Sequence, residues 1–221
     1  MNERNDPTIR DASAVAERYE RLASHYDTRW RGYTERTLRY ALDSLQCTGT
    51  ERVLDVGCGT GELAHLACER WPSITLIGVD VTAAMVAVAR RKLRGAPRAS
   101  FVLARSQALP FGDAQFDAVV CCNMLHHVPD PATMIQECGR VLRQHGVMVL
   151  VDWCQDFWHC RLMHGWLRLV DRTYVQMYRL RELQALVEAQ GLSVDAGVRF
   201  LVPPYYGMMG LRAVKWGSEQ V

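Results

Sequence analysis

The chain has 221 residues, 49% of them hydrophobic, so it is long enough to bury the core of one domain of ordinary size. Its 26 basic and 24 acidic residues give a formal net charge of +2 at pH 7, a balance that argues against a nucleic-acid binder relying on attraction to phosphates. No apolar run reaches the ~20 residues of a membrane span, and the polar residues 1–10 lack the apolar region of a signal peptide.

Helical periodicity first predicts two helices, over residues 11–24 and 34–45, before any strand. Extended and helical patterns then alternate along the chain. The predicted strands are 52–56, 74–79, 99–103, 116–122, 147–151, 192–198 and 208–214. The predicted helices that follow the first strand are 61–70, 83–93 with Thr82 as its cap, 131–143 with Pro131 at its first position, 157–173 and 180–190.

Strands that alternate with helices indicate an open α/β sheet covered by helices on both faces. Too few residues join the last two predicted strands to form an ordinary helix, so we expect those strands to pair antiparallel. Ligands of such sheets bind beyond the carboxyl ends of the strands, at the point where the strand order reverses. The loops after the first four strands lie there.

The eight cysteines are scattered and form no Cys-x-x-Cys pair, which argues against a disulfide framework and favours the reducing cytoplasm. Four potential zinc ligands lie close together in the sequence: Cys154, His159, Cys160 and His164. Structural zinc sites usually have more tightly paired ligands. We therefore expect core cysteines beside partly exposed histidines, and no metal.

A glycine turn occupies residues 53–64, with the sequence VLDVGCGTGELA. It begins as a buried strand, turns on Gly57, Gly59 and Gly61, and continues as a helix. A dinucleotide fingerprint, G-x-G-x-x-G, would place its third glycine at Glu62. Asp55, two residues before the first glycine, would repel a pyrophosphate and favours a cationic or zwitterionic ligand.

This run resembles motif I of the class I S-adenosylmethionine-dependent methyltransferases, in the broad group that includes the quinone methyltransferases. The resemblance is strongest over residues 53–152. It implies a Rossmann-like, doubly wound sheet of seven strands, mostly parallel with one antiparallel strand near the edge, and additional N-terminal helices. It also implies S-adenosylmethionine as the cofactor and S-adenosylhomocysteine as its product. We expect a single domain over residues 1–221, with an N-terminal helical lid (1–48), a cofactor-binding core (49–154) and a substrate side (155–221).

Asp80 closes the second predicted strand and matches the ribose-binding acid of the family, because a carboxylate can accept two hydrogen bonds from a ribose diol. The alternative is an aspartate that only caps the next helix. Val81 and Met85 can pack on the adenine faces, although Met85 also suits the core. The following loop, residues 104–111, has Arg105 where many members have an acid, and arginine cannot accept a hydrogen bond from adenine. Either Ser106 and Gln107 recognise adenine, or Arg105 points away.

Residues 116–131 resemble motif IV and the loop after it, which implies that Asn123, Met124 and Leu125 pass beside the methionine part of the cofactor. Residues 140–146 resemble the end of a family helix, with His145 replacing a common glycine and Gly146 fitting the helix exit. The resemblance also implies that Tyr26 and Trp30 contact the cofactor. Packing of the N-terminal helices on the sheet is the alternative. The complete set expected at the cofactor is Tyr26, Trp30, Asp55, Gly57, Cys58, Gly59, Gly61, Asp80, Val81, Met85, Ser106, Gln107, Asn123, Met124 and Leu125.

Methyl transfer from a sulfonium needs mainly placement of the reactants, and an acceptor that must lose a proton needs a general base. The candidates for this base are His126, His127 and Asp152, and a purely structural hydrogen bond is an equal alternative for either histidine. A small apolar or aromatic acceptor is expected from the aromatic residues near and beyond strand five: Trp153, Phe157, Trp158, Trp166, Tyr174, Tyr178, Tyr205 and Tyr206. Quinone-precursor methylation and natural-product tailoring both fit. The rival hypotheses are a module that binds the cofactor without turnover and a nicotinamide-dependent oxidoreductase.

Overall fold

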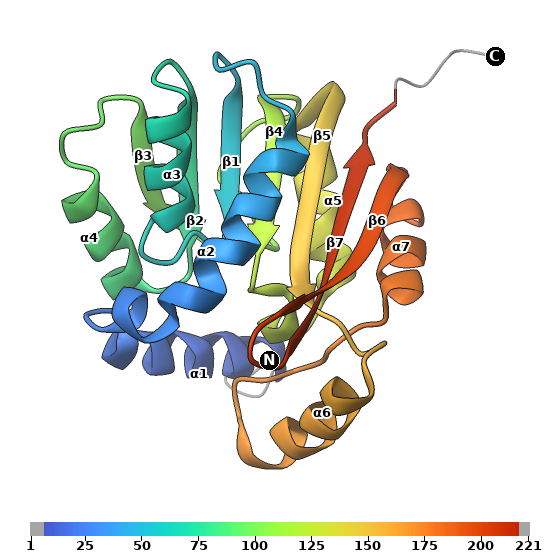
Figure 1. The fold of residues 1–221 in the computed structure, drawn as a ribbon. Helices are drawn as coiled ribbons and strands as arrows, with labels where there is room; N and C mark the ends of the chain where they lie inside the picture. The colour runs from blue at the N-terminus through green and yellow to red at the C-terminus, as the bar shows by residue number, and fades with distance from the viewer. Residues whose placement is uncertain (1–6, 217–221) are drawn as a thin grey trace, which may run out of the picture.

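The computed structural model describes residues 7–216, which form one seven-stranded sheet with helices on both faces (Figure 1). The helices are α1 (Pro7–Leu22), α2 (Tyr26–Leu45), α3 (Glu62–Arg70), α4 (Ala83–Lys92), the short 3₁₀ helix η2 (Leu125–His127), α5 (Pro131–Val141), α6 (Trp158–Val170) and α7 (Leu180–Glu188). The strands are β1 (Arg52–Val56), β2 (Thr75–Asp80), β3 (Ala99–Leu103), β4 (Phe116–Cys122), β5 (Leu142–Trp153), β6 (Ser193–Val202) and β7 (Tyr206–Val214).

The strand order is β3-β2-β1-β4-β5-β7-β6. Strands β1 to β5 pair parallel, whereas β7 pairs antiparallel with both β5 and β6. This topology confirms the predicted mixed sheet with one reversed strand near its edge. The strand order reverses between β1 and β4, so the carboxyl ends of these two strands flank the expected ligand crevice.

Two apolar layers hold the helices against the sheet. On one face, α2, α3 and α4 pack on the sheet through buried aliphatic side chains such as Leu42, Leu63 and Val86. On the other face, α5 and α7 bury Ile135 and Leu183. Both faces of the central strands are therefore covered, which explains why β4 is a continuous apolar run. Figure 1 shows α1 and α6 beyond the strand ends toward which β1 and β4 point.

Helix α2 begins at Tyr26, eight residues before the helix predicted over 34–45. Its extra turns carry Tyr26, Trp30 and Tyr33, which share one helix face at spacings of four and three residues. This face packs inward, since Tyr33 is buried and Trp30 packs against the core. The segment around Trp30, predicted as a connection between helices, is therefore helical because tertiary contacts cover its aromatic face.

The exit from α5 also differs from the prediction. The helix ends at Val141 and strand β5 begins at Leu142, with a register shift against β4 before the regular pairing from Val147. His145 itself adopts the left-handed conformation (φ 61°) expected of the glycine it replaces. A glycine is required at position 146 for a steric reason, because a Cβ atom there would lie only 2.8 Å from the carbonyl oxygen of Arg143.

Within the described residues, no helix combines the length and apolar character that crossing a bilayer requires.

Candidate active site

The carboxyl ends of β1, β2 and β4 border a first cavity. Helices α1 and α2 cover this cavity through Val15, Tyr19 and Tyr26. Its remaining walls come from the glycine turn and the loops after β2, β3 and β4, the four loops that the sequence placed at one sheet edge.

The glycine turn presents bare backbone to the first cavity. Gly57, Gly59 and Gly61 all have positive φ, the region that favours glycine. A Cβ atom on Gly57 would lie 2.7 Å from the Met124 side chain, whereas one on Gly59 would meet nothing within 4 Å. The turn is held in place because the backbone N–H groups of Gly57 and Cys58 both donate to the Val79 carbonyl. A ligand can therefore approach the backbone of Gly59 directly.

Asp80 lies at the wall of the first cavity and braces this turn. Its Oδ2 accepts from the Gly59 N–H and its Oδ1 from the Thr82 N–H, both at 2.9 Å. A carboxylate offers about four acceptor sites, so two remain for hydroxyl groups of a ligand. Burial raises the pKa of Asp80, and the backbone hydrogen bonds partly offset that rise.

Asp55 lies behind the turn and is only 2% exposed. Among residues 7–216 its Oδ2 has no hydrogen-bond partner, and burial, followed by the charge of Asp80, raises its pKa to about 7. An orphaned buried acceptor costs about 1–3 kcal/mol unless something donates to it. Asp55 lines neither cavity, so a cationic ligand beside the turn would act on this carboxyl through its charge and not through direct contact.

Ten of the residues expected at the cofactor line this first cavity. They are Tyr26, Gly57, Gly59, Asp80, Val81, Met85, Ser106, Gln107, Asn123 and Met124. In the loop after β3, Ser106 and Gln107 line the cavity, as one of the two alternatives expected. Arg105 lines it as well, beside them.

The other five expected cofactor residues do not line the first cavity. Asp55 lies behind the turn, Trp30 lines a second cavity, and Leu125, the first residue of η2, is buried in the core. Cys58 lies against Gly78 of β2, and Gly61 faces α4 and Phe101. These five residues therefore support the glycine turn and the neighbouring elements and do not form the surface of the first cavity.

A second cavity adjoins the first. Both cavities are lined by the same four residues, Tyr19, Tyr26, Asn123 and His127. The second cavity extends toward α6, where Trp166 and Leu167 line it. Ligands in the two cavities would therefore lie next to each other at these four residues.

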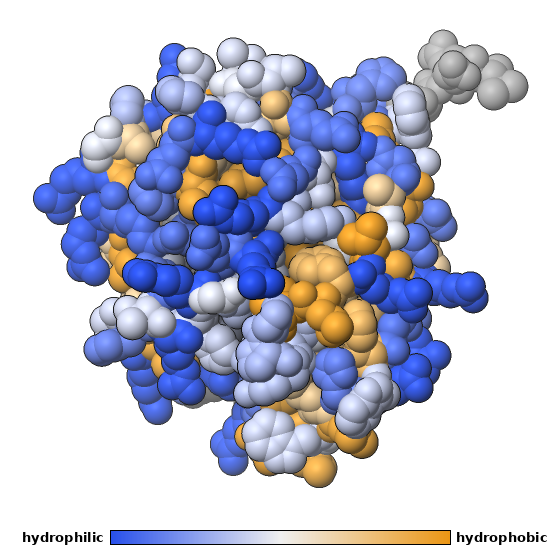
Figure 2. Space-filling view, in the orientation of Figure 1, coloured by the Kyte–Doolittle hydropathy of each residue, from blue (hydrophilic) through white to orange (hydrophobic). Residues whose placement is uncertain are grey.

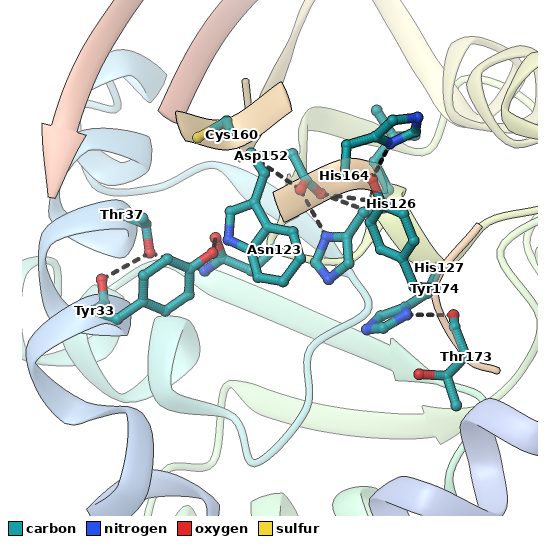
Figure 3. Close-up of polar contacts among 12 residues, drawn as sticks. Tyr33, Thr37, Asn123, His126, His127, Asp152, Cys160, His164, Thr173 and Tyr174 are labelled. Carbon is teal, nitrogen blue, oxygen red and sulfur yellow. Dashed lines mark hydrogen bonds and ion pairs between the residues drawn. The ribbon is translucent and has the colours of Figure 1, made fainter. Parts of the chain in front are cut away.

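His126 lines the second cavity and forms a buried pair with Asp152 (Figure 3). Its Nδ1 lies 2.7 Å from Asp152 Oδ1, while Asp152 Oδ2 accepts from the Leu125 N–H at 2.7 Å. Because a carboxylate only accepts, Nδ1 carries a proton, and in the neutral imidazole Nε2 then keeps a lone pair on the side away from Asp152. The imidazole stacks on Trp153 with the ring centres 4.1 Å apart.

Burial alone would raise the pKa of Asp152, but the charge and hydrogen bond of His126 and the Trp153 N–H lower it below its usual value. Asp152 lines neither cavity. It therefore orients His126 and is too deeply buried to reach a ligand itself, which removes it from the direct candidates for a base.

His127 lines both cavities, yet both of its ring nitrogens are occupied. Its Nδ1 lies 2.6 Å from the Thr173 carbonyl, so this nitrogen donates, and its Nε2 accepts from the Tyr19 hydroxyl at 2.8 Å. Burial lowers its pKa to about 3. In this conformation His127 joins α1 to the loop after α6 and has no free lone pair for a ligand proton.

The aromatic set predicted for the acceptor divides in two. Trp153, Trp166, Tyr174 and Tyr206 line the second cavity, together with Trp30 and Tyr33 of α2. Phe157, Trp158, Tyr178 and Tyr205 lie outside it. Tyr19 and Tyr33 were missed, and the spacing of Tyr26, Trp30 and Tyr33 along one helix face was the signal that could have found the second.

Three of the four potential zinc ligands around α6 take separate partners, and the buried Nε2 of His159 has none among the described residues. His164 Nδ1 bonds to the Tyr174 hydroxyl, Cys160 Sγ lies near the Gly207 carbonyl, and Cys154 Sγ near Asp156. In the part of the chain that the structure describes, no three His, Cys, Asp or Glu side chains converge as metal ligands.

Comparison with known proteins agrees with this geometry. Residues 53–146 match a family model described as a methyltransferase domain. The chain is 36% identical over 153 residues to a ubiquinone/menaquinone biosynthesis C-methyltransferase, UbiE, of Geobacter sulfurreducens, covering 65% of this chain and 57% of that protein. It is 32% identical over 170 residues to YcgJ, an uncharacterized methyltransferase of Bacillus subtilis, covering 75% of this chain and 66% of the relative.

A solved structure of one of these relatives has a similar fold. The crystal structure of the Bacillus YcgJ protein superposes with a TM-score of 0.72 at 23% identity, covering 83% of this chain and 100% of the other. This chain spans less than two thirds of the length of the curated relatives described above.

Proposed function

Because this chain belongs to the class I S-adenosylmethionine-dependent methyltransferases, we propose that it transfers a methyl group from S-adenosylmethionine to a small aromatic acceptor in the second cavity. The observation that carries the proposal is the shared wall. Tyr19, Tyr26, Asn123 and His127 line both cavities, so a donor in one and an acceptor in the other would lie next to each other.

The first cavity fits the cofactor in three respects. Gly59 leaves its backbone open, Asp80 keeps two acceptor sites for a ribose diol, and the buried carboxyl of Asp55, behind the turn, would attract an ammonium group through its charge when ionised. When bound, S-adenosylmethionine supplies an electrophilic methyl group on a sulfonium whose thioether is the leaving group. The protein then has to align the acceptor and exclude water, which can contribute roughly 7–11 kcal/mol in favourable cases.

We assign the role of general base to His126, which acts on an acidic hydroxyl of the acceptor. Asp152 fixes the tautomer that leaves Nε2 unprotonated, and this nitrogen can take a proton from a phenol-like hydroxyl. Removing that proton makes both the oxygen and the neighbouring ring carbons better nucleophiles. The name of the Geobacter relative, a quinone-pathway C-methyltransferase, supports a hydroxylated ring as the acceptor. His127 and Asp152 hold the site in shape.

Calorimetry with S-adenosylhomocysteine and with NAD tests the cofactor assignment. We expect binding of S-adenosylhomocysteine and none of NAD. Binding of NAD alone would contradict the methyltransferase proposal. A screen of phenols, hydroquinones and thiols with labelled S-adenosylmethionine, followed by mass spectrometry, identifies the acceptor atom. A chain that binds the cofactor but labels none of these acceptors would support the rival hypothesis of a binding module.

The His126→Gln variant tests the base. We expect kcat to fall by roughly 10²–10⁴-fold, because general base catalysis is lost, while affinity for S-adenosylhomocysteine stays unchanged. His65→Gln, on the exposed surface of α3, is the matched control and should keep full activity. An active His126→Gln enzyme with an unaltered pH profile would remove His126 from the mechanism.

A further inference from the structure

Helix α6 carries an unusual exposed apolar face. Trp158, Leu162, Trp166 and Leu169 recur at spacings of four, four and three residues, so they lie along one side of the helix, and Val170 extends that side. Trp158 is 73% exposed and Leu169 86% exposed. We call these five residues the α6 stripe. Its opposite side, with Cys160 and Leu167, is buried against Tyr174 and Met177. Soluble surfaces rarely leave a contiguous row of large apolar side chains uncovered.

Basic residues flank the α6 stripe. Arg161 and Arg168 lie on the same helix and Arg172 follows it, all exposed, and the helix contains no acidic residue between Trp158 and Val170. A neighbouring depression of the surface is lined by Arg18, Arg21, Arg29 and Arg172 together with one acidic residue, Glu17, so its charge balance is positive. Tryptophan and leucine on one side with arginine beside them is the composition of helices that lie in the interface of an anionic bilayer.

The α6 stripe continues into the second cavity. Trp166 and Val170 belong to the stripe and also line that cavity. In Figure 2 apolar residues surround the projecting part of the molecule that Figure 1 identifies as α6. A protein seated on the stripe would cover this rim, whereas a fluid lipid phase would leave an apolar molecule free to pass.

We propose that the α6 stripe and its flanking arginines dock this protein on the surface of an anionic lipid bilayer. The apolar side chains enter the boundary between headgroups and acyl chains, and Arg161, Arg168 and Arg172 contact lipid phosphates. The second cavity then opens toward the lipid. Docking itself does not depend on the proposed methyl transfer.

Co-sedimentation of the full chain with vesicles tests this surface. We expect binding to vesicles of phosphatidylcholine and phosphatidylglycerol, weaker binding to phosphatidylcholine alone, and weakening by salt, because the arginine contacts are screened. Leu169→Glu should weaken binding at least about tenfold, since it places a charge where an apolar side chain is buried. Leu169 lines neither cavity, so affinity for S-adenosylhomocysteine should be unchanged and reports that the variant is folded.

Leu103→Glu is the matched control, because Leu103 is also exposed, at 54%, but lies at the end of edge strand β3. This variant should bind vesicles like the unaltered chain. Three results would overturn the proposal: no vesicle binding, equal binding by the unaltered chain and Leu169→Glu, or equal losses in both variants. A dimer that Leu169→Glu converts to a monomer, without vesicle binding, would also overturn it and assign the face to a second copy. Vesicle binding needs no turnover, so an inactive chain that still binds separates this proposal from the proposed reaction.

Discussion

At the scale of single residues, two carboxylates beside the glycine turn differ in what they already bind. Asp80 accepts two backbone hydrogen bonds and lines the first cavity. Asp55 is buried behind the turn with one oxygen unpartnered among the described residues. Asp80 is therefore suited to positioning neutral hydroxyls, and Asp55 to a cation.

Replacing Asp80 with alanine should weaken S-adenosylhomocysteine binding at least about tenfold, because two charge-assisted bonds of roughly 1.5–3 kcal/mol each are lost, although not additively. Calorimetry measures the change. Since Asp80 also braces Gly59 and Thr82, Asp80→Asn serves as a second variant that keeps the shape, and thermal unfolding confirms that both fold. Asp113→Ala, at an exposed ion pair, is the control. Unchanged affinity in a folded Asp80 variant would refute the ribose role.

Asp55 makes a pH-dependent prediction. Its pKa of about 7 means that the carboxyl is largely protonated below this pH and ionised above it. The α-ammonium group of S-adenosylhomocysteine, a free amino acid, stays protonated over this pH range and is attracted to the ionised form of Asp55. Affinity for S-adenosylhomocysteine should therefore rise several-fold between about pH 6 and about pH 7.5 in the unaltered chain. The same titration should be nearly flat for Asp55→Asn, and parallel curves would place the ammonium elsewhere.

At the scale of elements, helix α2 joins the sheet to both cavities. Its first turn is tied to the glycine turn, because Asp27 Oδ1 accepts from the Thr60 hydroxyl at 2.5 Å and Lys92 bridges Asp27 to Glu62. Its later turns pack on β7, where Gly210 lets the Tyr40 ring lie directly against the strand. The position of Tyr26 and Tyr33 over the cavities depends on this packing.

Gly210→Ala should destabilise the fold by about 1–3 kcal/mol, because the new Cβ would overlap the Tyr40 ring and must displace it. Gly32→Ala, within the same helix α2, is the matched opposite. Nothing lies within 4 Å of its Cβ position, and alanine in a helix interior is favoured by about 0.8–1.0 kcal/mol over glycine. Urea unfolding should move the two midpoints in opposite directions. A Gly210→Ala variant as stable as the unaltered chain would show that α2 can shift without cost.

The elements that sequence reasoning predicted well are those with local signals. The apolar runs of β1 and β4, the glycine turn and Pro131 at the start of α5 depend on short-range chemistry. The starts of α2 and β5 were predicted wrongly. Burial of an aromatic face determines the first, and a hydrogen bond from the His145 N–H to the Lys215 carbonyl helps to determine the second. Which residues line a cavity likewise could not be predicted from the sequence, because it depends on how the elements pack. Tyr19 reaches the site from α1, whereas Leu125 turns from the expected cofactor contact into the core.

At the scale of the whole molecule, the two apolar layers hold most of the thiols. Six of the eight cysteines are buried, and Cys47 and Cys68 are partly exposed. Burial raises the pKa of Cys47 to about 12 and also raises that of Cys68, so even these thiols carry little thiolate at neutral pH. The reactivity of the cysteines therefore depends on the integrity of the fold.

A thiol reagent should accordingly label at most two cysteines of the native protein, and slowly, with the remaining six reacting only on unfolding. The urea midpoint followed by labelling should coincide with the midpoint followed by circular dichroism if the fold unfolds as one unit. S-adenosylhomocysteine at about 100 times its Kd should add roughly 2.7 kcal/mol to the free energy of unfolding. Rapid labelling of three or more native thiols would show that one apolar layer opens separately.

The wall that the two cavities share has a thermodynamic consequence. Tyr19 of α1 is bonded to His127, and Arg18 beside it reaches Asp171 and Thr173 on the loop after α6. Any ligand that orders α1 over one cavity also orders the wall of the other, so the second ligand meets a site that is already formed. Positive cooperativity between donor and acceptor follows, and linkage requires each ligand to raise the affinity of the other by the same factor.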